Sequence, residues 1–158
     1  MSGTVILSEG SEFEHVIQEV SKYINLYVMA FEKEERAFMR IDKRENMYGG
    51  NGTVYMIQMF DQEELANNRL AAYMVLLNKG DESGFHTHNA RNEEELYVVV
   101  HGTGEYRERT GTEGPIRKKM LQKGDITAIS SIGYHSVENT GHEPLIMFVI
   151  TTNTCLLY

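Results

Sequence analysis

The sequence predicts an all-β fold, a sandwich or barrel, with a helical extension at its N-terminus. From residue 53 onward, short apolar or alternating runs are separated by turn residues, at 53–60, 69–77, 95–100, 104–109, 116–121, 125–129, 135–138 and 145–151. Regular short strands of this kind are typical of sandwiches and barrels. In addition, three histidines and a glutamate between Gly80 and Asn139 have the spacing of one metal site inside a barrel.

The N-terminal extension, residues 1–45, is predicted to contain a helix and a strand. Ser11-Glu-Phe-Glu14 has the form of a capping box. Apolar residues then recur at intervals of three and four, namely Phe13, Val16, Ile17, Val20 and Ile24. This stripe is expected to pack on the outside of the barrel or against a second subunit. Leu26–Phe31 is β-like, and the charged segment after it is expected to be solvated.

The barrel domain is predicted to occupy residues 46–158. It begins with a turn at Tyr48–Gly52, where glycine and asparagine supply positive φ angles. Thr110–Pro115 is predicted to be a hairpin tip, and Gln62–Asn68 a loop or a single helical turn.

The metal site is predicted from strand periodicity. Alternate side chains of a strand share a face, so His86 and His88 point the same way. Counting back from the turn at His101–Gly104 places Glu95, Tyr97 and Val99 on one face of the next strand. If that face is inward, a carboxylate joins the two imidazoles. Such a set suits a divalent transition metal ion, and the residues do not choose among Zn, Fe, Mn, Ni, Co and Cu.

This stretch resembles the two motifs of the cupin superfamily. The first motif is matched by Gly80, five residues, His86-Thr-His88, then Glu95, six residues and Gly102. The second is matched by Gly124-Asp125, His135 and Asn139. The resemblance spans about residues 46–151 and is to small single-domain bacterial cupins. It implies a double-stranded β-helix, that is, a jelly-roll or cupin barrel, and a homodimer. The predicted metal ligands are His86, His88, Glu95 and His135.

Two departures from the family pattern affect this prediction. The gap from His88 to Glu95 is about two residues longer, because Asn89–Asn92 is inserted, so Glu93 or Glu94 competes for the ligand role. Glu95 is preferred because it keeps the six-residue distance to Gly102 and lies on the apolar strand. The usual Pro-x-Gly turn of the second motif appears here as Ser130-Ser-Ile-Gly133.

Composition excludes several classes of function. The chain has 158 residues, 41% of them hydrophobic, and a net charge of −8. Nucleic acids and anionic membranes attract clustered positive charge, so neither is expected as a partner. A single cysteine, Cys155, rules out an intramolecular disulfide, and with no apolar leader at Met1–Val5 the sequence predicts a cytoplasmic protein.

The preferred hypothesis is a metal-dependent enzyme acting on a small polar organic molecule. The resemblance implies a sugar or organic acid and isomerase, dioxygenase, decarboxylase or lyase chemistry, and the catalytic residues stay unassigned. Tyr97 and His101 share the predicted face of Glu95, but a core aromatic and a solvated loop position are the favoured interpretations. The alternative is a non-catalytic barrel that binds or senses a small ligand. Methionines on the strand-like runs are expected to fill the core, namely Met56, Met59, Met74 and Met147.

Overall fold

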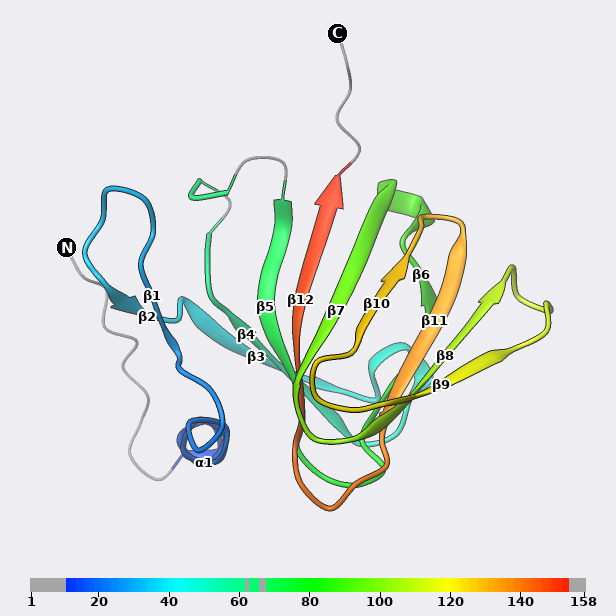
Figure 1. Cartoon of the computed structure of the whole chain (residues 1–158), viewed down its shortest axis with the longest axis horizontal. Coiled ribbons are helices and arrows are strands. Elements are labelled where there is room, and N and C mark those ends of the chain that lie inside the picture. Colours follow the sequence, from blue (N-terminus) through cyan, green and yellow to red (C-terminus); the bar gives the residue numbers. More distant parts are fainter. Residues whose placement is uncertain (1–10, 62, 66–67, 154–158) are drawn as a thin grey trace, which may run out of the picture.

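The computed structural model describes residues 11–61, 63–65 and 68–153, which fold into antiparallel sheets (Figure 1). The strands in chain order are β1 (Tyr27–Val28), β2 (Arg36–Ala37), β3 (Arg40–Glu45), β4 (Thr53–Gln58), β5 (Asn68–Leu76), β6 (Glu82–Thr87), β7 (Glu93–His101), β8 (Gly104–Thr110), β9 (Arg117–Leu121), β10 (Ile126–Ile129), β11 (Gly133–Asn139) and β12 (Leu145–Asn153). One sheet has the order β10-β7-β12-β5-β4-β3, the second has the order β6-β11-β8-β9, and β1 pairs with β2. This is the predicted jelly-roll barrel with its N-terminal helix.

The core lies between the two large sheets because their strands alternate apolar and polar residues. On β7, Glu93, Glu95, Tyr97 and Val99 are buried, while Glu94 is exposed. The predicted alternation of this strand is therefore confirmed, and its inward face carries two carboxylates into the barrel. The four methionines expected in the core are all buried.

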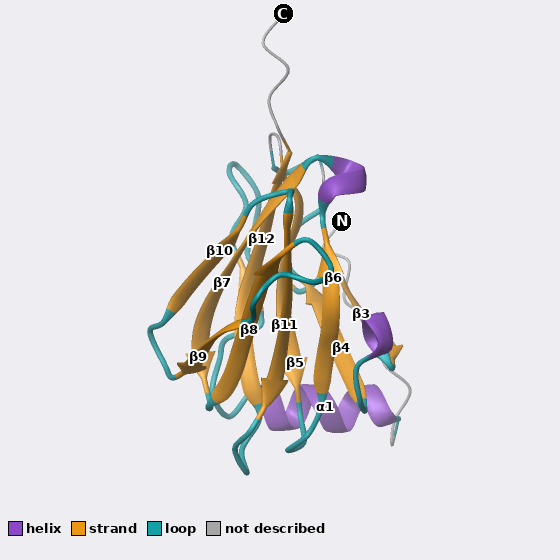
Figure 2. Ribbon diagram, turned by 90° about the vertical axis from the view of Figure 1, so that its right-hand side faces the viewer, coloured by secondary structure: helices purple, strands orange, loops and turns teal. Residues whose placement is uncertain are grey.

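The helix α1 (Glu12–Val20) packs on the outer face of the six-stranded sheet (Figure 2). The side chain of its N-cap, Ser11, accepts a hydrogen bond from the backbone N–H of Glu14, as the capping box predicts. Val16 and Val20 are fully buried, in a cluster with sheet residues such as Ile57. Burying two such side chains contributes roughly 1.5–3 kcal/mol each. The apolar stripe is thus covered by the chain's own sheet.

A 3-10 turn, η1 (Met47–Gly49), is held against β6 by close backbone packing. A Cβ added at Gly84 would lie 2.3 Å from the carbonyl oxygen of Tyr48, so only glycine allows this approach. Tyr48 itself has a positive φ of 52°, which is uncommon outside glycine. The predicted turn at Tyr48–Gly52 is confirmed, and it places the Tyr48 ring on the ring of His86.

The strands before β4 differ from the prediction. The strand expected in Leu26–Phe31 is only the two-residue β1, whereas the charged β3 forms an edge strand that was not expected. Edge strands tolerate charges because one side faces solvent.

The domain boundary at residue 45 stays a prediction. Cys155 lies outside the described residues. In the described part of the chain, the helices are too short or too polar to cross a bilayer.

Candidate metal centre

Three elements position the four predicted ligands. His135 on β11 stands directly opposite His86 on β6 in the antiparallel ladder. His88 is the first residue after β6 and precedes a second 3-10 turn, η2 (Asn89–Arg91). Glu95 reaches the cluster from β7 of the other sheet. The structure therefore brings together the four residues whose spacing predicted a site.

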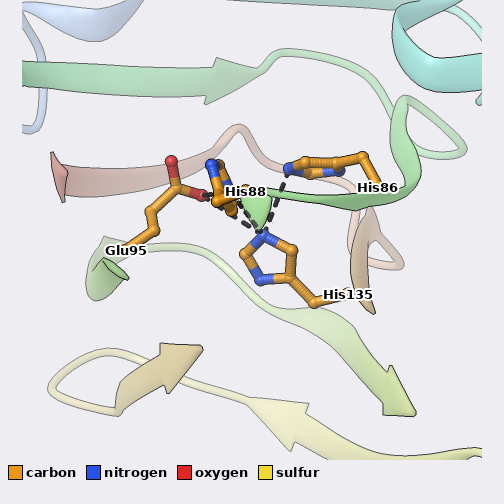
Figure 3. A group of neighbouring side chains, drawn as sticks. All are labelled: His86, His88, Glu95 and His135. Atoms are coloured by element: carbon orange, nitrogen blue, oxygen red, sulfur yellow. Dashed lines mark hydrogen bonds and ion pairs between the residues drawn. The ribbon is translucent and has the colours of Figure 1, made fainter. Parts of the chain in front are cut away.

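The side chains converge on one point between the sheets (Figure 3). The Nε2 atom of His135 lies 3.1 Å from Nε2 of His86 and 3.2 Å from Nε2 of His88. Oε1 of Glu95 lies 3.3 Å from Nε2 of both His88 and His135. Atoms bound to one ion at about 2.0–2.2 Å lie roughly 3.0–3.5 Å from their neighbours. These separations fit a shared metal ion.

The contacts of each imidazole at Nδ1, the nitrogen on its outer side, indicate which nitrogen faces the centre. Nδ1 of His86 is 2.8 Å from the carbonyl oxygen of Gly84, which only accepts, so Nδ1 carries the proton. Nδ1 of His135 is 3.3 Å from the Tyr106 hydroxyl, which itself donates to Glu108. Nδ1 of His88 is 3.7 Å from a Glu93 carboxylate oxygen.

With its proton on Nδ1, His86 turns the Nε2 lone pair toward the cluster, where Nε2 of His88 and His135 and the Glu95 carboxylate also meet. Acceptors that crowd together in this way repel one another unless a proton or a metal cation lies among them. Hydrogen bonds from the outer nitrogen of a ligand histidine to a carbonyl or carboxylate are the usual support of protein metal sites. The donor set of three imidazoles and one carboxylate therefore fits a divalent transition metal.

Burying these four polar side chains together costs free energy unless a cation binds among them. All four side chains are buried, and Oε1 of Glu95 has no hydrogen-bond partner among the described residues. Burial and then the neighbouring His135 lower the pKa of His86 to about 4, so its imidazole is neutral and able to bind a metal. Burial alone raises the pKa of Glu95, but the facing imidazoles of His135 and His88 outweigh it and hold the carboxyl ionised.

A cavity of about 290 Å³ opens beside the cluster. Three of the ligands, His86, His88 and Glu95, form part of its wall. The other lining residues are one aromatic, two arginines and four apolar side chains, namely Tyr48, Arg44, Arg91, Met47, Met56, Leu70 and Met74. A small molecule in this cavity can therefore reach the ligand cluster directly.

The structure separates the three glutamates that competed for one ligand position. Glu94 is exposed on the outer face of β7, so it cannot reach the histidines. Glu93 shares the inward face of Glu95, but its carboxylate faces the outer nitrogen of His88. Among the three, only Glu95 is within the cluster of potential ligands.

The two candidate catalytic residues both lie outside the cavity wall. Tyr97 is fully buried and stacks on His135, with ring centroids 5.1 Å apart, which agrees with the core interpretation. Burial and the nearby Glu95 charge raise the pKa of its hydroxyl, so it stays protonated.

His101 was expected on the face of Glu95, and that expectation is wrong. The pairing of β7 with β12 shifts register between Val99 and His101, which breaks the alternation. The His101 ring instead stacks on Tyr23 at 3.7 Å, and its Nε2 lies 3.5 Å from Glu143. A solvated loop position is also not what the structure shows, since the ring is packed against the N-terminal extension.

Sequence reasoning missed Tyr48, Arg44 and Arg91 as parts of the site. The Tyr48 ring stacks on His86 at 4.0 Å and so helps to fix that imidazole. Arg91 lies in η2, which is formed by the inserted residues Asn89–Asn92. The insertion was visible in the sequence. The sequence does not show that Arg91 lines the cavity, because that position depends on how η2 folds.

The comparisons with known proteins agree with this architecture. A sequence model of the cupin domain family matches residues 73–151. A Thermotoga maritima protein named oxalate-binding protein is 31% identical over 104 residues, which covers 66% of this chain and 79% of that protein.

Solved structures with a similar fold include two proteins named for oxalate decarboxylase. A predicted oxalate decarboxylase from Thermotoga maritima superposes with a TM-score of 0.64 at 27% identity, covering 80% of this chain and 99% of that one. An oxalate decarboxylase from Lactobacillus farciminis, solved with formate, has a TM-score of 0.55 at 23% identity. That match covers 73% of this chain but 32% of the decarboxylase, and it supports the fold alone.

Proposed function

The chain belongs to the cupin family, and we propose that it is a metal-dependent protein that binds a small organic acid and acts on it. The proposed metal ligands are His86, His88, Glu95 and His135. The observation that carries the proposal is the convergence of three buried imidazoles and one carboxylate beside a cavity. The identity of the ion, among Zn, Fe, Mn, Ni, Co and Cu, is left open by this donor set.

Charge supports an acid as the ligand. A divalent ion with three neutral imidazoles and one carboxylate keeps a net positive charge, so an anion is favoured in the cavity. The relative named oxalate-binding protein supports the same class of ligand. When bound, the metal would act as a Lewis acid toward a carboxylate or carbonyl oxygen.

The chain's own residues would prepare the site for that chemistry. The Gly84 carbonyl oxygen and the Tyr106 hydroxyl contact Nδ1 of His86 and His135. A Glu93 carboxylate oxygen faces Nδ1 of His88 at 3.7 Å, too far for a hydrogen bond. Tyr48 covers one face of His86, which limits its rotation. Glu95 supplies the single negative charge of the ligand set.

A non-catalytic binding protein is the second candidate, and one observation favours it. Among the described residues lining the cavity, none outside the proposed ligands is a carboxylate or an imidazole. General acid–base catalysis by such a group therefore has no candidate at the cavity wall. The predicted homodimer and the cytoplasmic location stay predictions.

Isothermal titration calorimetry tests the proposed function. The metal-loaded protein is titrated with oxalate, in parallel with the metal-free protein, the His135→Ala variant and a His142→Ala control. His142 is exposed and outside the cluster, so its loss should leave binding intact. We expect saturable binding only where the metal and His135 are both present. Equal binding by the metal-free protein would contradict the proposal.

Product analysis of the same mixtures separates the two candidates. Nuclear magnetic resonance of the organic acid over hours measures whether it is consumed. Metal-dependent loss of the acid indicates an enzyme. Binding without consumption, across a panel of organic acids, indicates the non-catalytic barrel.

A further inference from the structure

Two arginines in the cavity wall have no assigned partner. Arg44 on β3 is partly buried, and Arg91 in η2 is exposed at the mouth. Within the described ranges of the chain, neither guanidinium makes a hydrogen bond or an ion pair. Most other arginines here do have one: Arg36 pairs with Glu64 and Arg107 with Glu138. In a chain of net charge −8, two uncompensated guanidiniums facing one cavity indicate an anionic ligand.

The rest of the cavity wall outside the proposed ligands is mostly apolar. Met56 and Met74 are buried core residues, and Met47 and Leu70 pack against the same cluster. The thioether side chains offer no hydrogen bond of useful strength, so the part of the ligand that contacts them is expected to be hydrocarbon. The cavity of about 290 Å³ holds on the order of ten water volumes, at ~30 Å³ each. It is therefore larger than oxalate requires.

We propose that Arg44 and Arg91 form a second carboxylate subsite, so that the ligand is a dicarboxylate whose two ends are joined by a hydrocarbon segment. This inference rests on the proposed function, in which the metal holds the first carboxylate. The hydrocarbon segment lies against the methionines, and the far carboxylate meets the guanidiniums. Arginine suits this role because its planar fork donates two parallel hydrogen bonds to one carboxylate.

The test compares two acids with the same number of carbons. Glutarate and pentanoate differ only in the second carboxylate, so the ratio of their dissociation constants isolates that group. Calorimetry on the metal-loaded protein is repeated with the Arg44→Met and Arg91→Met variants, which keep an unbranched apolar stem and remove the charged guanidinium. Arg40→Met is the matched control, because Arg40 lies on the same strand and outside the cavity wall.

We expect the wild-type protein and Arg40→Met to bind glutarate at least about tenfold more tightly than pentanoate. Arg44→Met and Arg91→Met are expected to lose most of this preference and to keep their affinity for pentanoate, which shows that the site is still folded. Equal affinities in the wild type, or a preference that survives both variants, would overturn the inference and leave the proposed function standing. Failure of oxalate, glutarate and pentanoate alike to bind would overturn both.

Discussion

Glu93 is buried on the inner face of β7, and its carboxylate faces Nδ1 of His88 at 3.7 Å. A carboxylate on the outer nitrogen of a metal-bound histidine fixes the ring and raises its basicity. Glu93 is thus placed to support the His88 ring, whereas its neighbour Glu94, exposed on the outer face, is not.

The Glu93→Gln variant tests this role. It keeps the shape of the side chain and removes its charge, so we expect metal affinity to fall by about 10- to 100-fold. Competition with a chromogenic chelator measures the affinity. Glu94→Gln is the control and should leave the affinity unchanged. An equal effect of the two substitutions, or none for Glu93→Gln, would remove the supporting role.

At the scale of single residues, period-two alternation predicted most of the cluster. It placed Glu95 and Tyr97 inward and, applied one step further back, places Glu93 inward as well. It failed at His101, because a register shift depends on the pairing partner β12 and leaves no mark in β7. Arg44 and Arg91 are far apart in sequence, so their meeting in one cavity depends on the tertiary fold.

At the scale of elements, α1 shows how the outer face of the barrel is closed. Its apolar stripe contacts the six-stranded sheet, and Glu12 also forms contacts with Lys43 on β3 and the Tyr55 hydroxyl on β4. The helix was predictable from its capping box and apolar spacing. Its docking site was not, because an apolar stripe can pack equally well on the chain's own sheet or on a second subunit. The edge strand β3 escaped prediction because five of its six residues are charged and only Ile41 is apolar.

The Val16→Ala variant tests the packing of α1. Val16 is fully buried under the sheet, so removing its methyl groups should lower the free energy of unfolding by about 1–3 kcal/mol. Urea denaturation at several protein concentrations measures it. Gln18→Ala, exposed on the same helix, should change the stability by less than about 0.5 kcal/mol. A cost for Val16→Ala that disappears on dilution would instead place the stripe at a contact between chains.

At the scale of the whole molecule, the packing of the two large sheets assembles the site. Two facing sheets bring the histidines at the end of β6 and on β11 onto the carboxylate of β7, beside a cavity that three of these ligands line. The barrel was predictable because the strands from β4 to β12, apart from β6, each coincide with a strand-like run in the sequence. The choice of metal and ligand was not, because it depends on a cavity shaped by side chains from separate elements.

Elemental analysis of the purified protein is the measurement that tests the central claim most directly. The wild-type protein is compared with a His86→Ala/His135→Ala variant after identical metal reconstitution and desalting, with circular dichroism to verify that both are folded. We expect about one equivalent of a transition metal per chain in the wild type and almost none in the folded variant, because two of four ligands are lost. Equal metal content in the two proteins would contradict the assignment of the metal centre.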